Sequence, residues 1–288
     1  MNEIQHPSLR RLLVGFDFSL RARNAAETAF ELAARVGGTV QLAASLPGRV
    51  DSQVLIDLAR RDPATFGQTD MADNGAILLE SGLQALRAIC AAMEPASVPW
   101  TVSTSLDGPV DMIHDIVEEE NIDLVLVGST GAGNVRRWLV GSTAEKLAKD
   151  IPRPLWVASD HRPMRRILCP LDPTRVSARA MVWAWSLSKR FGAELHVLHA
   201  WEPGSSESME AAHQAFDAFL DASGVRGDIA DIHFHVASAA DFICEQTATL
   251  NADLIVIGNK RRQGVSAVVM GSTATRVLQK MPASVLMV

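Results

Sequence analysis

Two glycine-rich segments of this chain have the residue types and spacing of loops that hold phosphate. Residues 128–147 read GSTGAGNVRRWLVGSTAEKL, and residues 258–278 read GNKRRQGVSAVVMGSTATRVL. Each segment begins with a glycine directly after an apolar run and contains Gly-Ser-Thr before a helical pattern. A glycine-rich backbone between a buried strand and a helix N-terminus surrounds an anion with N–H groups. The repeat therefore predicts a phosphate site in at least one copy.

The glycines of the first copy suit three different tasks. Gly128 ends a strand where the backbone must turn, and Gly131 lets the chain approach a phosphate without an intervening side chain. Gly141 opens the next helix, whose free N–H groups and dipole favour an anion. The second copy keeps the outer glycines but has Arg261 in place of Gly131. Arg261 either obstructs the cradle or supplies a cation to an anionic ligand, and we favour a degenerate, non-binding copy.

The elements that must position these loops follow the same order in both halves of the chain. Each half opens with a short apolar run that ends in an aspartate, Asp17 or Asp172. Continuous apolar runs suit strands that are buried on both faces of a parallel sheet. Helical patterns follow at residues 20–36 and 176–191, and glycines close both of them.

Strands and helices alternate along the rest of each half. Further strands are expected to start near residues 40, 99, 123, 155, 194, 232, 253 and 284. Further helices are expected over residues 75–93, 109–120, 207–222 and 239–250, and after each Gly-Ser-Thr. This alternation predicts an α/β protein made of two tandem Rossmann-like domains, 1–158 and 164–288. Each domain is expected to be a five-stranded, mainly parallel sheet with helices on both faces.

Composition narrows the classes of partner. A chain of 288 residues with 48% hydrophobic residues can bury two cores. The net charge is −6 and no dense basic face is apparent, so no nucleic-acid partner is expected. No apolar run reaches the roughly 18 residues that span a bilayer. The three scattered cysteines indicate reduced core residues in a cytoplasmic protein.

The spacing Gly128-x2-Gly131-x9-Gly141-Ser142, with an aspartate that closes the first strand, resembles the universal stress protein family over nearly the whole chain. The resemblance implies adenine nucleotide alpha hydrolase-like domains that bind ATP, or ADP or AMP. It places Asp17 at the adenine and Val40 beside the base. The residues implied to contact ribose and phosphates are Val127, Gly128, Thr130, Gly131, Gly141, Ser142 and Thr143. Family members pair through their last strands, so an internal pseudo-dimer of the two halves is expected, and a homodimer is compatible with it.

Three positions in the first half have competing interpretations. Asp17 could cap the following helix, although Ser19 is equally placed to do so. Ser142 and Glu145 also fit a capping box, which would occupy the Ser142 hydroxyl. Glu145 would repel a phosphate one turn away, so a divalent metal, Mg²⁺, is expected with a bound triphosphate.

These residues support three functional classes. We favour a stress-response protein whose first half binds an adenine nucleotide as a regulatory ligand. A slow ATPase or phosphotransfer enzyme is the second class, for which the sequence offers no identifiable general base and no catalytic residue is assigned. A scaffold with a vestigial site is the third.

Two further features do not decide between these classes. His233 and His235 face the same side of one strand and would form a metal site if the strand with His196 and His199 is adjacent. Histidines satisfied as core or edge residues are the favoured interpretation, so no metal ligand is assigned. The first half also carries extra residues near 47–74, which form either a lid or partner surface or a tolerated surface insertion.

Overall fold

The protein folds around one continuous sheet. The computed structural model describes residues 7–46, 74–93, 98–130, 140–202, 208–259 and 270–288, without the side chains of residues 74–77 and 175. The ten strands of these residues have the order β3-β2-β1-β4-β5-β10-β9-β6-β7-β8. The extra residues 47–73, together with Gly131 and Arg261, lie outside the described residues.

Within the described residues, the first half contributes five strands and four helices. The strands are β1 (Arg11–Gly15), β2 (Thr39–Ser45), β3 (Trp100–Ser105), β4 (Leu124–Gly128) and β5 (Leu155–Ala158). The helices are α1 (Leu20–Val36), α4 (Asn74–Ala92), α5 (Pro109–Glu119) and α6 (Ser142–Asp150).

The second half repeats this order of elements. Its strands are β6 (Arg166–Pro170), β7 (Glu194–Trp201), β8 (Asp231–Val236), β9 (Leu254–Ile257) and β10 (Ser284–Met287). Its helices are α7 (Arg175–Phe191), α8 (Met209–Ser223), α9 (Ala239–Thr249) and α10 (Ser272–Lys280), with a short 3-10 helix η2 (Arg226–Asp228).

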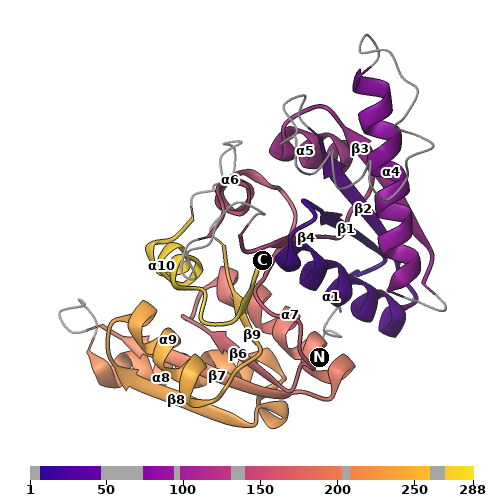
Figure 1. Ribbon diagram of the computed structural model, residues 1–288. Coiled ribbons are helices and arrows are strands. Elements are labelled where there is room, and N and C mark those ends of the chain that lie inside the picture. The colour runs from indigo at the N-terminus through magenta and orange to yellow at the C-terminus, as the bar shows by residue number, and fades with distance from the viewer. Residues whose placement is uncertain (1–6, 47–73, 94–97, 131–139, 203–207, 260–269) are drawn as a thin grey trace.

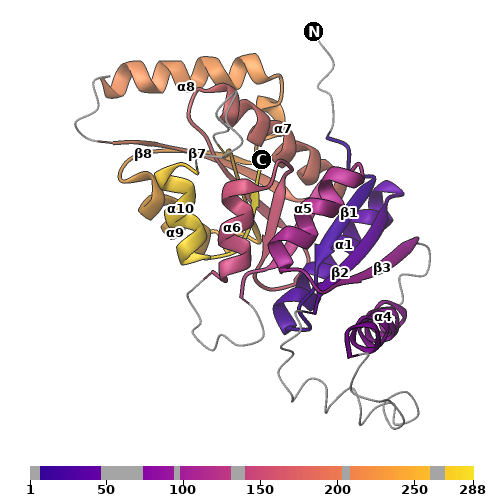
Figure 2. The ribbon, with the colours of Figure 1, turned by 90° about the horizontal axis from the view of Figure 1, so that it is seen from above.

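The sheet separates two hydrophobic layers, and helices cover both faces (Figures 1 and 2). Alternate strand residues such as Leu12 and Val14 pack in one layer with α1, α4, α7 and α8. Leu13 and its equivalents pack in the other layer with α5, α6, α9 and α10. The central strands are apolar at consecutive positions because both of their faces are buried. The predicted fold class, two tandem α/β domains with mainly parallel sheets, is confirmed.

The ends of the first helix in each half follow from single residues. Ser19 caps α1 by accepting from the N–H of Ala22, and Thr174 caps α7 by accepting from the N–H of Ser177. Gly37 and Gly192 end these helices at φ values of 64° and 65°. The left-handed conformation strains residues with a Cβ, so the predicted glycine stops are confirmed.

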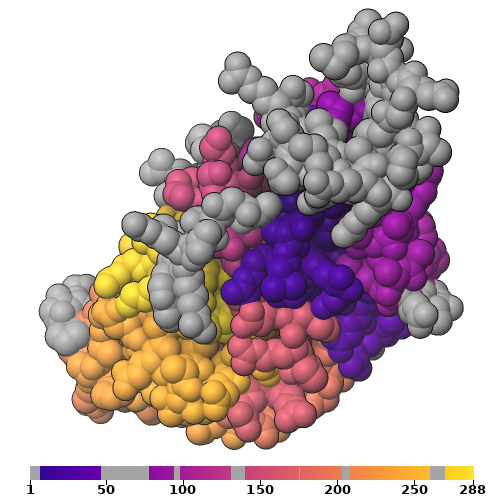
Figure 3. Space-filling view, viewed as in Figure 1, coloured from indigo at the N-terminus to yellow at the C-terminus, as the bar shows by residue number. Residues whose placement is uncertain are grey.

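The two halves join through their last strands. β5 and β10 pair antiparallel, whereas the other strand pairs of the described sheet are parallel. Beside this seam, the Arg35 guanidinium lies 4.4 Å from the centroid of the Phe191 ring. Figure 3 shows the surfaces of the two halves in direct contact. The expected internal pseudo-dimer is therefore confirmed.

Two expectations from composition can be compared with the structure. The three cysteines are free thiols, and Cys90 and Cys169 are buried. Burial raises the pKa of the Cys90 thiol to about 11, which keeps it neutral. Among the described helices, none has the length and apolar character needed to cross a membrane.

Candidate functional site

A cavity of about 380 Å³ opens at the carboxyl ends of the first-half strands. β1 and β4 are neighbours, yet the chain runs from β1 toward β2 and β3 on one side and from β4 toward β5 on the other. Ligands of open α/β sheets bind at such a reversal, because the loops that leave the two strands diverge there. The residues that line the cavity are Gly15, Phe16, Asp17, Ser45, Pro109, Met112, Ile113, Val127, Gly128, Gly141, Ser142, Thr143 and Ala144.

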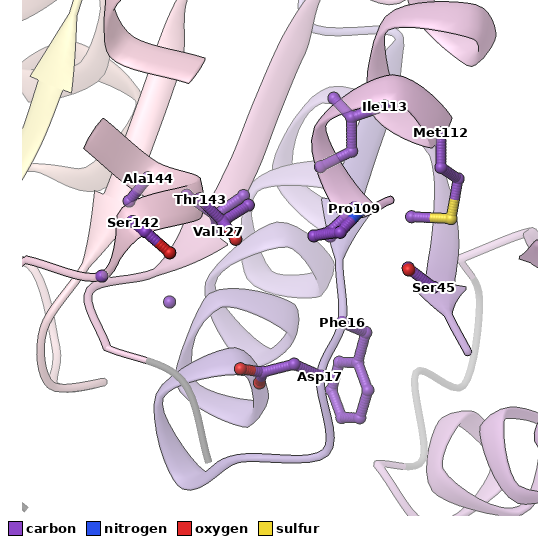
Figure 4. A pocket seen from close by; sticks show the side chains of 13 residues that line it. Phe16, Asp17, Ser45, Pro109, Met112, Ile113, Val127, Ser142, Thr143 and Ala144 are labelled. Carbon is purple, nitrogen blue, oxygen red and sulfur yellow. The ribbon is translucent and has the colours of Figure 1, made fainter. Parts of the chain in front are cut away.

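Asp17 brings an exposed carboxylate to this cavity from the loop after β1. Its Oδ1 accepts the backbone N–H of Ser19 at 3.1 Å. Ser19 caps α1, so the interpretation of Asp17 as the helix cap is wrong. Asp17 and Ser142 come from different elements and border the same opening (Figure 4). The carboxylate can therefore accept a hydrogen bond from a ligand in the cavity.

The loop that carries Asp17 has an unusual backbone. Phe18 has a φ of 62°, in the left-handed region that residues with a Cβ rarely adopt. Its ring packs edge-on against Phe16, with the ring centroids 5.4 Å apart. Strained residues of this kind persist only where the surrounding structure holds them, and they concentrate at functional sites.

The amino end of α6 forms another wall of the cavity. Gly141 is the N-cap, and no side chain of the described part of the chain caps this helix. The interpretation of Ser142 and Glu145 as a capping box is wrong, because Ser142 is already the first helical residue. The first hydrogen bond of the helix runs from the N–H of Glu145 to Gly141 O at 3.0 Å. The N–H groups of Ser142, Thr143 and Ala144 therefore lack acceptors within the helix, as an anion site requires.

Glu145 does not face the cavity. Its carboxylate accepts a hydrogen bond from Lys149 Nζ at 2.7 Å, one turn further along α6. Glu145 is also not among the residues that line the cavity. The expectation of a divalent metal rested on repulsion between Glu145 and a phosphate. The ammonium group of Lys149 offsets this repulsion.

Gly128 has a packing reason to be glycine. A Cβ on Gly128 would lie 2.8 Å from the backbone nitrogen of Ala22 and 2.8 Å from the carbonyl carbon of Arg21. A Cβ on Gly258 would lie 2.4 Å from Cγ1 of Val176, at the equivalent place in the second half. Because these glycines have no Cβ, the ends of β4 and β9 can lie close to the first turns of α1 and α7. This packing accounts for their recurrence without any ligand.

The prediction that Val40 lies beside the base of a bound nucleotide is wrong. Val40 lies at the amino end of β2, where it pairs with Leu12, and it is 1% exposed. It borders a different hollow at the opposite edge of the sheet, together with Trp100. Parallel strands put their amino ends at one edge and their carboxyl ends at the other, so Val40 cannot flank a ligand beside Asp17. The residue of β2 that lines the cavity is Ser45, at the carboxyl end.

The loop between β4 and α6 is described only at its two ends. The N–H of Gly141 donates to Ser129 O at 2.6 Å, which holds the start and the end of the loop together. Thr130 belongs to the described residues but does not line the cavity. Its predicted contact with a nucleotide, like that of Gly131, stays a prediction.

The equivalent aspartate of the second half has different partners. Asp172 Oδ1 accepts hydrogen bonds from Ser177 Oγ and, at 2.7 Å, from Thr174 Oγ1. In the first half, Ala22 occupies the position of Ser177 and offers no hydroxyl. The Asp172 oxygen is therefore held by hydroxyls at the start of its own helix, α7.

Several lining residues were not predicted from the sequence. Phe16 and Ser45 follow the rule that residues at the carboxyl ends of neighbouring parallel strands meet at one edge, so this rule could have identified them. Pro109, Met112 and Ile113 belong to the first turns of α5. Met112 and Ile113 lie on the buried side of the helix, whereas Pro109 is exposed. Which residues of α5 border a cavity depends on the packing of the helix, and its periodicity does not tell.

The chain matches a family of known sequences over both halves. The model of the universal stress protein family matches residues 8–159 and 163–288. A universal stress protein of Mycobacterium tuberculosis is 25% identical over 288 residues, which cover 93% of this chain and 92% of the relative. Another, from Mycolicibacterium smegmatis, is 26% identical over 185 residues, 59% of this chain and 62% of the relative.

Solved structures with the same fold span the whole chain. The crystal structure of a universal stress protein from Archaeoglobus fulgidus has a TM-score of 0.71 and 19% identity, covering 96% of this chain and 97% of its own. A putative universal stress protein from Pseudomonas aeruginosa has a TM-score of 0.70 and 21% identity, covering 100% of this chain and 95% of its own. At these identities, the likeness shows the fold.

Proposed function

Because the chain belongs to the universal stress protein family in both of its halves, we propose that the cavity of the first half binds ATP or a related adenine nucleotide. The nucleotide acts as a regulatory ligand in a cytoplasmic stress response. The nucleotide domain is residues 1–158, and residues 164–288 form a domain with a degenerate loop.

One observation carries this proposal. The cavity brings an exposed acceptor, Asp17, and the open first turn of α6 to the same opening at the reversal between β1 and β4. An adenine nucleotide has the matching groups, since its base carries an amino donor and its other end carries phosphate. The helix dipole and the free N–H groups favour the phosphates at Ser142 and Thr143.

The rest of the cavity suits a flat base and a ribose. Met112, Ile113 and Val127 contribute apolar surface, and Ser45 contributes a hydroxyl. Small-molecule sites combine mainly apolar walls with a few polar groups that fix the orientation of the ligand. Asp17 is then the group that distinguishes an amino-bearing base from a base that carries only acceptors at that position.

Magnesium enters this proposal with the nucleotide. Mg²⁺ binds through phosphates and keeps much of its water, so the triphosphate itself can hold it. Glu145 is engaged by Lys149, so we do not assign it to the metal. ATP and ADP binding are therefore expected to be insensitive to the charge of Glu145.

A route from this cavity to the second half is present in α6. Asn259 donates from Nδ2 to the carbonyl oxygen of Ala148 at 3.0 Å, so the second half contacts the helix whose first turn borders the cavity. A nucleotide that favours one position of α6 shifts the protein toward the arrangement with that position. This linkage is how a bound nucleotide would alter contacts with a partner protein.

The test is ATP titration by calorimetry with a variant of the α6 N-terminus, Ser142→Asp. A carboxylate there repels phosphate, and like charges about 4 Å apart cost about 1–4 kcal/mol between water and a protein surface, so affinity should fall about tenfold or more. An aspartate in the first turn favours the helix by about 0.3–1 kcal/mol, so folding stability should not fall. Loss of binding would then not be a loss of structure.

The second half supplies the matched control, Ser272→Asp, at the first residue of α10. This variant should bind ATP like the unmodified protein. Failure of the unmodified protein to bind nucleotide at millimolar concentration would refute the proposal and favour a scaffold. Equal loss in both variants would place the site away from α6. Phosphate release that is abolished by Ser142→Asp would indicate an ATPase at this cavity.

A further inference from the structure

A group of possible metal ligands lies at the far end of the sheet, away from the nucleotide cavity. β7 and β8 are adjacent, and β8 is the outer strand of the second half (Figure 1). His196 on β7 pairs in register with Asp231 on β8, and His233 follows two residues later on the same face. One ligand atom from each of these three residues lies within 4.8 Å of the others.

The histidine nitrogens of this group lack the partners that buried polar atoms normally have. His196 is 8% exposed, and neither its Nδ1 nor its Nε2 has a hydrogen-bond partner among the residues that the structure describes. Nε2 of His233 is also buried without a hydrogen bond. Burying such a group unpaired costs free energy, and each case in a native structure calls for an explanation such as an ion.

The separations within the group fit a metal better than hydrogen bonds. Nε2 of His233 lies 3.5 Å from Asp231 Oδ2, and the ligand atoms of the three residues lie within 4.8 Å of one another. Outside the group, Nε2 of His196 lies 3.5 Å from Glu194 Oε2. N–H···O bonds cluster near 2.9–3.0 Å, so these contacts are long for hydrogen bonds. Ligands at about 2.0–2.1 Å around a tetrahedral ion are about 3.3 Å apart. Small side-chain rotations would therefore close the group around an ion.

The charge around the group also favours a cation. Arg166 Nε donates to Glu194 Oε2 at 3.1 Å, and its Nη1 donates to the carbonyl oxygen of Leu250. The guanidinium is thereby engaged beside the histidines. Two carboxylates, Glu194 and Asp231, against one guanidinium leave the group with a net negative charge. Asp231 is exposed, so an ion can enter from solvent.

We propose that His196, Asp231 and His233 bind a divalent transition metal of the zinc class. Two imidazoles and one carboxylate suit Zn²⁺ and its neighbours, whereas Mg²⁺ and Ca²⁺ prefer sets made of oxygens. With three protein ligands, the ion keeps a position for water, as in exchangeable zinc sites. Glu194 lies beside His196 and is placed to orient its ring.

The other two histidines of these strands are excluded by their contacts. His199 Nδ1 bonds to the carbonyl oxygen of Leu171 at 2.7 Å, and its ring stacks on Phe216 on the other face of the sheet. His235 packs edge-on against Phe242, and its Nδ1 accepts the N–H of Val236. The pairing of His233 with His235 considered from the sequence is therefore wrong, and adjacent strands bring His196 to His233 instead.

An ion here would join the outer strand β8 to β7. Because the three ligands come together only in the folded chain, metal binding stabilises the folded state by linkage. This site is independent of the nucleotide cavity, and its failure would leave the proposed function untouched.

The test is titration of the full chain, stripped of metal with EDTA, with Zn²⁺ followed by calorimetry. One ion per chain should bind, the melting temperature should rise with zinc, and Co²⁺ should give the visible absorption of a tetrahedral site. His233→Gln and Asp231→Asn remove ligands at more exposed positions, and His196→Gln removes the buried one. Loss of an orienting neighbour alone weakens metal sites about 10–100-fold, so loss of a ligand should weaken zinc binding at least as much.

His235→Gln is the matched control, since it removes a histidine from the same face of the same strand. It should bind zinc like the unmodified chain. Melting temperatures in EDTA show whether each variant still folds, so a folded His233→Gln or Asp231→Asn protein suffices for the test. The proposal is overturned if zinc does not bind, if those variants bind it undiminished, or if His235→Gln weakens it equally.

Discussion

The carboxylates of Asp17 and Asp172 occupy equivalent positions in the two halves but have different hydrogen-bond partners. One oxygen of Asp172 accepts from two hydroxyls of its own half, whereas Asp17 accepts a backbone N–H and borders an open cavity. One of these two hydroxyls, that of Ser177, has no counterpart in the first half, where Ala22 occupies the position. An acceptor that is already engaged has less to offer a ligand, so the two copies differ in binding capacity at this position.

Glycine at position 128 is required by packing against α1, in addition to its predicted contact with a nucleotide. Gly128→Ala should lower the free energy of unfolding by about 1–3 kcal/mol, because the new Cβ would press on the backbone of α1 and force a shift. Urea denaturation measures this difference.

The matched control for that substitution is Gly227→Ala, since no atom of the described residues lies within 4 Å of a Cβ at Gly227. Its effect should stay within about 0.5 kcal/mol, as for most surface changes. A Gly128→Ala protein as stable as the unmodified one would mean that the close approach of β4 to α1 has no energetic consequence.

At the scale of elements, helix N-termini divide into those that are capped by a side chain and those that are left open. Ser19 and Thr174 cap α1 and α7, while α6 and α10 begin at glycines without a side-chain cap. A capped helix has satisfied its first N–H groups, and an open one leaves them to water or to a ligand. The cavity of the first half borders the open type.

Pairing between α7 and η2 gives the second half a pH-dependent contact. Asp228 accepts hydrogen bonds from Lys189 Nζ and, at 2.7 Å, from Trp185 Nε1. The bond from Lys189, followed by the bond from Trp185, lowers the pKa of the Asp228 carboxyl below its usual range. A lowered folded-state pKa contributes stability that is present above the unfolded pKa of about 3.9 and is lost as the pH falls through the folded value.

Asp228→Asn should therefore reduce the free energy of unfolding near pH 7. The difference from the unmodified protein should shrink as the pH falls from about 4 through the lowered folded-state pKa, because Asp228 becomes protonated first in the unfolded chain and then in the folded protein. Urea unfolding at a series of pH values measures this. A difference that is constant down to pH 3 would show that the ion pair contributes nothing and that only shape was changed.

At the scale of the whole molecule, the seam between β5 and β10 makes the two halves one structure. Leu286 pairs in register with Trp156 across this seam and is fully buried. Both hydrophobic layers contain residues from the two halves, so neither half completes its core alone. The last strands of the two halves have a neighbouring strand on each side, so neither is an open edge of the sheet.

Leu286→Ala should lower the free energy of unfolding by about 2–5 kcal/mol, as truncation of a buried leucine does. We expect a single unfolding transition that shifts as a unit, with the same midpoint by circular dichroism and by tryptophan fluorescence. Leu20→Ala, at a side chain that is 73% exposed, is the control and should change little. Two separate transitions, of which only one shifts, would show that the halves unfold independently.

The sequence by itself determined the order of elements, the repeat and six of the 13 residues that line the cavity. Apolar periodicity placed the strands and helices, because a strand buried on both faces and a helix buried on one face require different spacings. Glycines such as Gly37 and Gly192 marked helix ends because only the backbone conformation is at stake there. Asp17, Gly141 and Ser142 were identified because motif spacing is a local property of the chain.

Tertiary structure alone decided which distant residues meet. The residue of β2 that lines the cavity is Ser45, whereas the sequence had suggested Val40. Only the direction of the strand in the sheet tells which of its ends reaches the cavity. Tertiary structure also brought His196 to His233 through the pairing of β7 with β8, which no local pattern contains. Spacing along one segment reports on the backbone of that segment, whereas a site is made from segments whose register and direction are fixed by packing between them.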